Sequence, residues 1–210
     1  NTDIIQSSIR EVIVTLFGPN LDETQIPADI DPGEKETGRA CRLLLVGADW
    51  RRKGCDVAVE ATRLLREGGM DATLTICGCR KPPDVELPEY VTMLPFLSKN
   101  SPEDMRRLAD LYRRTTLFLF PTRAETFGIV MLEACAFGVP IVAARTGGVP
   151  SIVRHEKNGL LVDAVEDPRA YAAAVRRIAG DPAVYARYAV GAREFHERHG
   201  NWRIWARKVH

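Results

Sequence analysis

The chain has 210 residues, 45% of them hydrophobic and 27% charged, which is typical of a globular protein. This length favours one domain, and a domain of this size buries about 70% of its unfolded-chain surface. With 29 Lys and Arg against 28 Asp and Glu, the net charge of +1 excludes a protein that binds nucleic acid or an anionic membrane through its overall charge. No apolar run approaches the roughly 20 residues that span a bilayer.

Two features of the chain bear on where it works. It starts at Asn1 with nothing that resembles a signal peptide, so either residues were removed or the sequence is a piece of a longer protein. Its five cysteines, an odd number, lie in apolar segments without the spacing of a zinc site. We expect buried, reduced thiols in a cytoplasmic protein, the alternative being a redox or metal pair at Cys77 and Cys79.

The first 40 residues are irregular. An apolar, strand-like run over Val12–Phe17 is followed by a polar stretch, Asp22–Gly38, which is typical of a linker or surface loop. From residue 42 on, apolar runs alternate with segments of helical periodicity. We predict strands over about 42–46, 72–77, 90–94, 117–120, 139–143 and 159–162, and helices over about 55–67, 101–113, 128–137, 149–154, 167–179 and 181–199. This alternation predicts an α/β fold with a doubly wound parallel sheet, which binds ligands beyond the carboxyl ends of its strands.

The loop after the first predicted strand carries three consecutive cations. It begins at Gly47 and contains Arg51, Arg52 and Lys53 directly before a predicted helix. Free amides at a helix N-terminus attract anions, and the added cations favour a phosphate site. A solvated basic loop is the other interpretation. Neither GxxxxGK[ST] nor GxGxxG is present, which argues against a Walker loop and against a nicotinamide-dependent dehydrogenase.

The loop after the fourth predicted strand opens a helix and offers two carboxylates. Phe127, Gly128 and Ile129 provide amides at the helix start, while Glu125 lies in the loop and Glu133 about one and a half turns into the helix. Carboxylates accept hydrogen bonds from sugar hydroxyls well, so two of them beside an anion site suit a nucleotide sugar. Two ordinary helix glutamates or a divalent-metal site are the alternatives.

These loops carry a resemblance to a known family. The stretch from Pro121 reads PTRAETFGIVMLEACAFGVPIVAARTGGVP and is followed by NGLLV, which ends at Val162. It resembles the C-terminal half of retaining glycosyltransferases of group 1, also called family 4, which have the two-domain GT-B fold. The mark of that family is Glu-x7-Glu, met here by Glu125 and Glu133, and Lys53 stands at the lysine of its G-x5-K-G loop. The resemblance covers about residues 42–205 and implies a Rossmann-like domain.

The resemblance implies roles for the residues of the first loop. The loop from Gly47 would surround the diphosphate of a nucleoside diphosphate sugar, with Lys53 holding it. The family commonly has Arg where this chain has Ala48, and Arg51 or Arg52 would supply that charge instead. In the second loop, Glu125 would bind the transferred sugar, which makes it a catalytic residue together with Lys53.

The resemblance also implies where the rest of the donor would lie. The backbone of residues 127–129 would contact sugar and phosphate, and Glu133 would accept the ribose hydroxyls. The 78–81 loop, with Arg80 as a candidate for stacking, and the turn holding Leu94 and Phe96 would flank the base. No cofactor and no essential metal are expected.

The family resemblance implies that the chain is one part of a larger enzyme. Residues 1–40 would be an interdomain linker and a strand from a missing N-terminal half, and residues 41–210 the nucleotide-sugar-binding domain with a closing helix that holds Trp202 and Trp205. The missing domain would bind the acceptor hydroxyl compound and would be the part through which the protein associates with a membrane.

Two other functions stay open at this point. A nucleotide-sugar epimerase of related fold would rearrange the donor without an acceptor, and it would need further acids and a His near the sugar. The four histidines lie outside the motif loops, at His155, His196, His199 and His210. A non-catalytic nucleotide-binding or interaction module is the second alternative.

Overall fold

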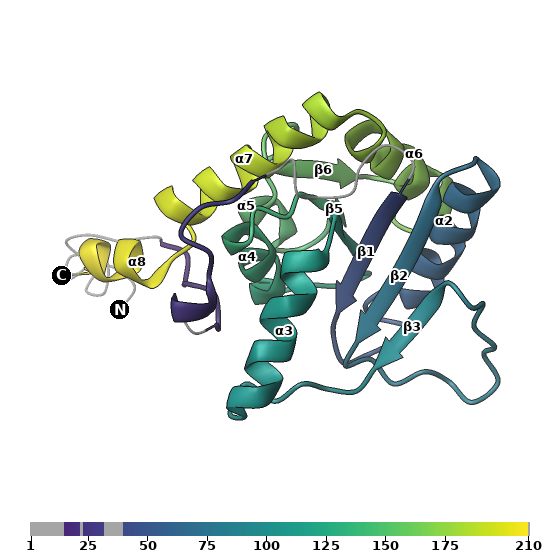
Figure 1. Cartoon of the computed structure of the whole chain (residues 1–210), viewed down its shortest axis with the longest axis horizontal. Helices are drawn as coiled ribbons and strands as arrows, with labels where there is room; N and C mark the ends of the chain where they lie inside the picture. Colours follow the sequence, from purple (N-terminus) through teal and green to yellow (C-terminus); the bar gives the residue numbers. More distant parts are fainter. Residues whose placement is uncertain (1–14, 22, 32–39, 210) are drawn as a thin grey trace, which may run out of the picture.

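The structure is a computed structural model that describes residues 15–21, 23–31 and 40–209. A six-stranded sheet forms its centre (Figure 1). The strands are Ala40–Val46 (β1), Asp71–Cys77 (β2), Val91–Leu94 (β3), Leu117–Phe120 (β4), Ile141–Ala144 (β5) and Gly159–Val162 (β6). Each of them overlaps a predicted strand. Every pair of neighbours runs parallel, which confirms the expected α/β class.

The order of the strands creates one reversal of winding direction. The order is β3-β2-β1-β4-β5-β6, so the chain winds from β1 outward to β3, crosses to β4, and winds outward again to β6. The two halves of the sheet join where β1 pairs with β4, through Leu43 with Leu117 and Leu44 with Phe118. At such a switch point the loops that follow the two strands lead away in opposite directions and leave a crevice for a ligand.

Helices cover both faces of the sheet, and local sequence signals set their starts. Ser101, Asp167 and Asp181 each accept a hydrogen bond from an amide of the first turn, and Pro follows each of them. The helices are Cys55–Glu67 (α2), Pro102–Arg114 (α3), Ile129–Ala136 (α4), Val149–Ile152 (α5), Pro168–Ala179 (α6), Pro182–Arg198 (α7) and Trp202–Val209 (α8), and a 3-10 turn, η1, covers Glu23–Gln25.

Alternating side chains of the strands supply two hydrophobic cores, one on each side of the sheet. In β1, Leu43 and Leu45 pack into the core that includes α2 and α6, whereas Leu44 packs into the core that includes α3 and α4. Helix α7 contacts both α4 and α6 and lies along one end of the molecule (Figure 1).

The cysteines belong to these cores. All five are buried, as expected. Burial raises the pKa of Cys41 and of Cys135 to about 12, and raises that of Cys77 to about 11. These three thiols therefore stay protonated at neutral pH and behave as small apolar side chains.

The N-terminal segment differs from its prediction. The strand expected over Val12–Phe17 lies partly outside the described residues, and its described part, Thr15–Phe17, forms no strand. The Phe17 ring packs instead against the ring of Trp202 in α8, with 6.0 Å between their centroids. The division of the chain at residue 40 stays a prediction.

Within the described residues, none of the helices has the length and apolar character needed to cross a membrane.

Candidate functional site

The two motif loops meet at the switch point of the sheet. The amide of Arg123, in the loop after β4, donates to the carbonyl of Arg52 in the loop after β1 at 2.8 Å, and the Thr122 hydroxyl donates to the same carbonyl at 3.0 Å. Gly54, which caps α2, has φ +69°, and a Cβ there would clash with the carbonyl oxygen of Pro121. The close approach of the two loops therefore needs glycine at position 54.

Lys53 and Glu125 form the centre of this site. The ammonium of Lys53 donates to Glu125 Oε2, and it also lies 4.7 Å from the centroid of the Phe120 ring. Lys53 is only 7% exposed, so the pair is partly shielded from water. A Cβ at Gly47 would lie 2.6 Å from Cγ of Lys53, so the glycine leaves room for the lysine side chain. The two residues predicted to be catalytic are thus in direct contact.

The start of α4 lies beside the Glu125 carboxylate. The Phe127 amide donates to Glu125 Oε1 at 3.3 Å, and the Gly148 amide donates to the Glu125 carbonyl at 2.9 Å. Gly128 precedes the helix with φ +82°, and no side chain caps the helix start there. The predicted group of amides and Glu125 is therefore brought together, with one of these amides already bound to the carboxylate.

Arg51 and Arg52 give the rim of the site its positive charge. Both side chains are exposed, and neither forms an ion pair with any residue that the structure describes. The backbone amide of Arg52 donates to Asp49 Oδ1 at 2.6 Å. The Arg52 guanidinium donates to the Ala124 carbonyl at 3.4 Å. Two cations beside Lys53 that have no carboxylate partner in the described part of the chain favour an anionic ligand.

The residues predicted to flank a base also gather at this edge. The Gly78 amide donates to the Leu94 carbonyl at 3.1 Å, and the Arg80 amide donates to the Ala48 carbonyl at 3.3 Å. The Gly47 amide donates to the Cys77 carbonyl at the end of β2, at 3.0 Å. The Phe96 side chain beside them is 72% exposed. The ends of β1, β2 and β3 therefore present one continuous surface.

Glu133 is placed differently from Glu125. It is fully buried in α4, where its Oε1 accepts from the Lys99 ammonium and its Oε2 accepts from the Tyr112 hydroxyl at 3.0 Å. Burial raises the pKa of Glu133, and the charge and hydrogen bonds of Lys99 and Tyr112 offset only part of this effect. The structure does not join Glu133 to the Lys53–Glu125 pair, and both of its oxygens are bound by the protein.

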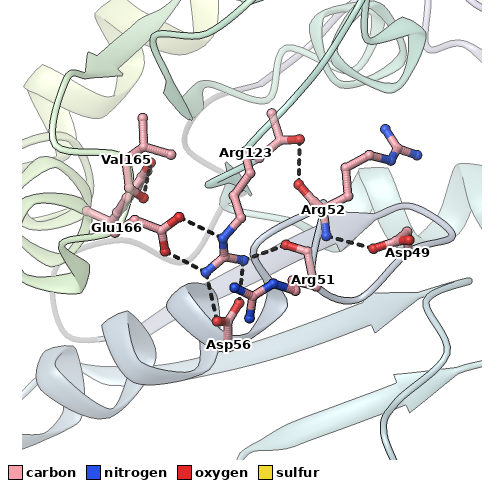
Figure 2. Close-up of polar contacts among 9 residues, drawn as sticks. Asp49, Arg51, Arg52, Asp56, Arg123, Val165 and Glu166 are labelled. Atoms are coloured by element: carbon pink, nitrogen blue, oxygen red, sulfur yellow. Dashed lines mark hydrogen bonds and ion pairs between the residues drawn. The ribbon is translucent and has the colours of Figure 1, made fainter.

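The sequence prediction missed Arg123, which connects three loops (Figure 2). Its guanidinium binds Asp56 in the first turn of α2, Glu166 in the loop before α6, and the Arg51 carbonyl. A weak signal was present, because Arg123 lies two residues before Glu125 and all three loops follow the carboxyl ends of strands. Lys99 and Tyr112 were missed as well, and nothing in their spacing connects them with Glu133.

Comparison with known proteins agrees with this geometry. A family model described as glycosyl transferases group 1 matches residues 40–181. A D-inositol 3-phosphate glycosyltransferase of Catenulispora acidiphila is 34% identical over 180 residues, which cover 77% of this chain and 43% of that relative. The chain spans about half the length of the curated relatives it matches.

Two solved structures share the fold. WaaG, a glycosyltransferase involved in lipopolysaccharide biosynthesis, has a TM-score of 0.69 and 20% identity over 86% of this chain and 51% of its own. HepE of Anabaena, in complex with UDP and glucose, has a TM-score of 0.69 and 19% identity over 99% of this chain and 58% of its own. These likenesses confirm the doubly wound, Rossmann-like domain of GT-B glycosyltransferases. Because the family model covers more than half of the chain, the chain belongs to the group 1 glycosyl transferases.

Proposed function

We propose that the crevice between the β1 and β4 loops binds a nucleoside diphosphate sugar, the donor of a retaining glycosyltransferase. The contact between Lys53 and Glu125 carries this proposal, because it sets a cation for the diphosphate directly beside a carboxylate for the sugar. The solved HepE structures that share the fold hold UDP with glucose, or UDP-glucose, which supports a donor of this chemical class.

Lys53 and the two arginines of the rim would act on the diphosphate. When the bond to the sugar breaks, negative charge accumulates on the departing diphosphate, and fixed cations lower the energy of that state. Lys53 is held by Glu125 and Phe120, so little reorganisation is needed when the charge develops. The exposed Arg51 and Arg52 would complete the charge balance for a diphosphate. No step of this scheme needs a metal ion.

Glu125 would orient the transferred sugar. Its Oε2 faces Lys53, and its Oε1 accepts a long hydrogen bond from the Phe127 amide, a contact that a sugar hydroxyl could replace. Transfer itself also needs an acceptor hydroxyl. We propose that an acceptor-binding domain, within the length of the relatives that this chain does not span, faces the crevice.

Calorimetry with UDP-, GDP- and ADP-sugars tests the donor site on this chain. We expect one of the three bases to bind and Lys53→Ala to reduce that affinity at least tenfold, because it removes the buried cation. Lys157→Ala, which removes an exposed lysine from the loop before β6, is the matched control and should change the affinity less than twofold. If the wild-type chain binds none of the three donors, the proposed function is wrong.

Turnover in the full-length enzyme tests the chemistry. Glu125→Gln and Lys53→Ala should each lower the rate at least tenfold, whereas addition of EDTA should leave it unchanged. A near-normal rate in either variant contradicts the role given to that residue. The anomeric configuration of the product, followed by NMR, decides retention separately, and an inverted product would refute that part alone.

A further inference from the structure

The Arg123 guanidinium is fully bound by protein groups. Its Nε donates to Glu166 Oε1 at 2.7 Å, and its Nη2 donates to Glu166 Oε2 at 2.5 Å and to Asp56 Oδ2 at 2.8 Å. Its Nη1 donates to Asp56 Oδ1 at 2.9 Å and also to the Arg51 carbonyl. These five contacts use the five N–H donors that a guanidinium has, so the side chain has none left for a phosphate.

Arg123 and its partners come from three separate loops (Figure 2). Arg51 and Asp56 belong to the cation-bearing loop after β1 and to the first turn of α2, Arg123 follows β4, and Glu166 follows β6. Asp56 and Arg123 are 67 positions apart, and Arg123 and Glu166 are 43 positions apart, so no local sequence interaction produces this arrangement. The Arg123 side chain thus joins loops from both halves of the sheet, in addition to the Lys53–Glu125 contact.

The same arginine controls the charge next to the rim. Asp56 and Glu166 together bring two negative charges beside a loop that has to attract an anion. Burial acts to raise the pKa of Asp56, but the hydrogen bonds and charge of Arg123 outweigh it and hold the pKa below its usual range. Without Arg123, the negative charges of Asp56 and Glu166 would be uncompensated and would repel a diphosphate from the rim.

We infer that Arg123 is a positioning residue for the diphosphate loop, residues 47–54, and that it acts by two means. It fixes the backbone of this loop through the Arg51 carbonyl and offsets one of the two negative charges of Asp56 and Glu166, while Arg51, Arg52 and Lys53 face the donor. This inference rests on the proposed function, in which the loop binds a diphosphate. Arg123 itself touches no part of the ligand.

The substitution Arg123→Lys separates geometry from charge. Lysine keeps the positive charge, but its three donors on one nitrogen cannot bridge two carboxylates in a forked arrangement and also reach a carbonyl. Arg145→Lys is the matched control, since Arg145 donates to Asp163 at 2.6 Å as an exposed pair in the neighbouring loops.

Hydrogen exchange tests the positioning of the loop without any ligand. The amides of Lys53, Gly54 and Cys55 are protected by hydrogen bonds within the loop, to carbonyls of Asp49, Arg51 and Trp50. In Arg123→Lys we expect these three amides to exchange at least tenfold faster, with α7 and the Arg145→Lys control unchanged. Unchanged exchange at these amides overturns the inference, whether or not a donor binds.

Calorimetry with whichever of UDP, GDP and ADP the wild-type chain binds, and with the matching nucleoside, tests the consequence for the ligand. Arg123→Lys should weaken binding of the nucleoside diphosphate at least tenfold and that of the nucleoside less than twofold, because only the former carries the diphosphate. Equal loss for both compounds, or no loss for the nucleoside diphosphate, overturns the inference while the proposed function stands. If the wild-type chain binds none of UDP, GDP and ADP, the proposed function is wrong. The exchange rates then still decide whether Arg123 positions the loop.

Discussion

At the scale of single residues, Glu133 shows how a motif residue is constrained by its surroundings. It is fully buried, while Lys99, which binds it, comes from the loop after β3 and is 25% exposed. The Lys53–Glu125 and Lys99–Glu133 pairs join residues 72 and 34 positions apart. The Glu-x7-Glu spacing predicted that both carboxylates matter, but it could not reveal their lysine partners, because spacing along one helix carries no information about the loops that pack on it.

The Lys99–Glu133 pair makes a prediction about stability and pH. Lys99→Met leaves a buried carboxylate without its cation, and we expect a loss of about 2 kcal/mol in the free energy of unfolding at neutral pH. Burial already raises the pKa of Glu133, so the cost of its charge is absent at low pH and grows as the pH rises through its folded-state pKa. Urea unfolding at pH 5 and pH 8 should therefore show a smaller loss at pH 5.

Two variants control this measurement. Adding Glu133→Gln to Lys99→Met should restore most of the lost stability at pH 8, because no buried charge remains. Lys157→Met removes an exposed lysine and should change stability by less than about 0.5 kcal/mol. The interpretation is wrong if the Lys99→Met loss is the same at both pH values.

At the scale of helices and strands, the sequence predicted nearly all of the fold. The strands over 117–120 and 159–162 and the helix over 55–67 have the predicted bounds, and the other predicted elements from residue 42 on differ by one or two residues at an end. Local signals suffice there, since caps such as Ser101 act within one turn. Arg123 could not be given a role in this way, because its partners lie in loops that only the folded sheet brings together. The apolar run over Val12–Phe17 lies partly outside the described residues, and its described part, Thr15–Phe17, forms no strand; the contact of Phe17 with Trp202 could not be predicted locally either.

Gly54 and Gly69 form a natural pair for testing the contact between the two motif loops. Both have positive φ, +69° and +84°, so a Cβ strains the backbone similarly at each. A Cβ at Gly69 meets nothing within 4 Å, whereas one at Gly54 clashes with Pro121. Thermal or urea unfolding should show a cost of about 1 kcal/mol for Gly69→Ala and about 3 kcal/mol or more for Gly54→Ala. Equal costs would mean that the loops separate easily.

At the scale of the whole molecule, an aromatic row extends from the site to the end of the described chain. Phe127 contacts Phe17 edge-on at 5.6 Å, Phe17 contacts Trp202, and Trp202 contacts Trp205 at 5.8 Å. Phe17 and Trp202 are 48% and 41% exposed, and α8 has no buried residue. This helix therefore contributes little to either core. The N-terminal segment holds it, because the Pro19 carbonyl accepts a hydrogen bond from the Trp202 indole at 2.9 Å.

Removal of residues 201–210 tests how independent the sheet domain is. We expect a single cooperative transition and a fall in Tm of about 4–8 °C, which corresponds to about 2 kcal/mol for a chain of this size. Donor affinity should change less than twofold. Phe17→Ala should cost less in the shortened chain than in the full chain, because Trp202 is gone and only Phe127 remains as a ring partner. Two separate transitions in calorimetry would contradict the picture of α8 as a peripheral element.

The strand order has a consequence for how the site forms during folding. Lys53 follows β1 and Glu125 follows β4, and the two halves of the sheet join only along the short β1–β4 pairing. Each half can gain local order earlier, since its contacts are nearer in sequence, but the β1–β4 contact closes a loop of about 70 residues and carries the larger entropic cost. The Lys53–Glu125 contact is therefore complete only when folding is complete. A donor that binds there stabilises the finished sheet and none of its partly folded forms.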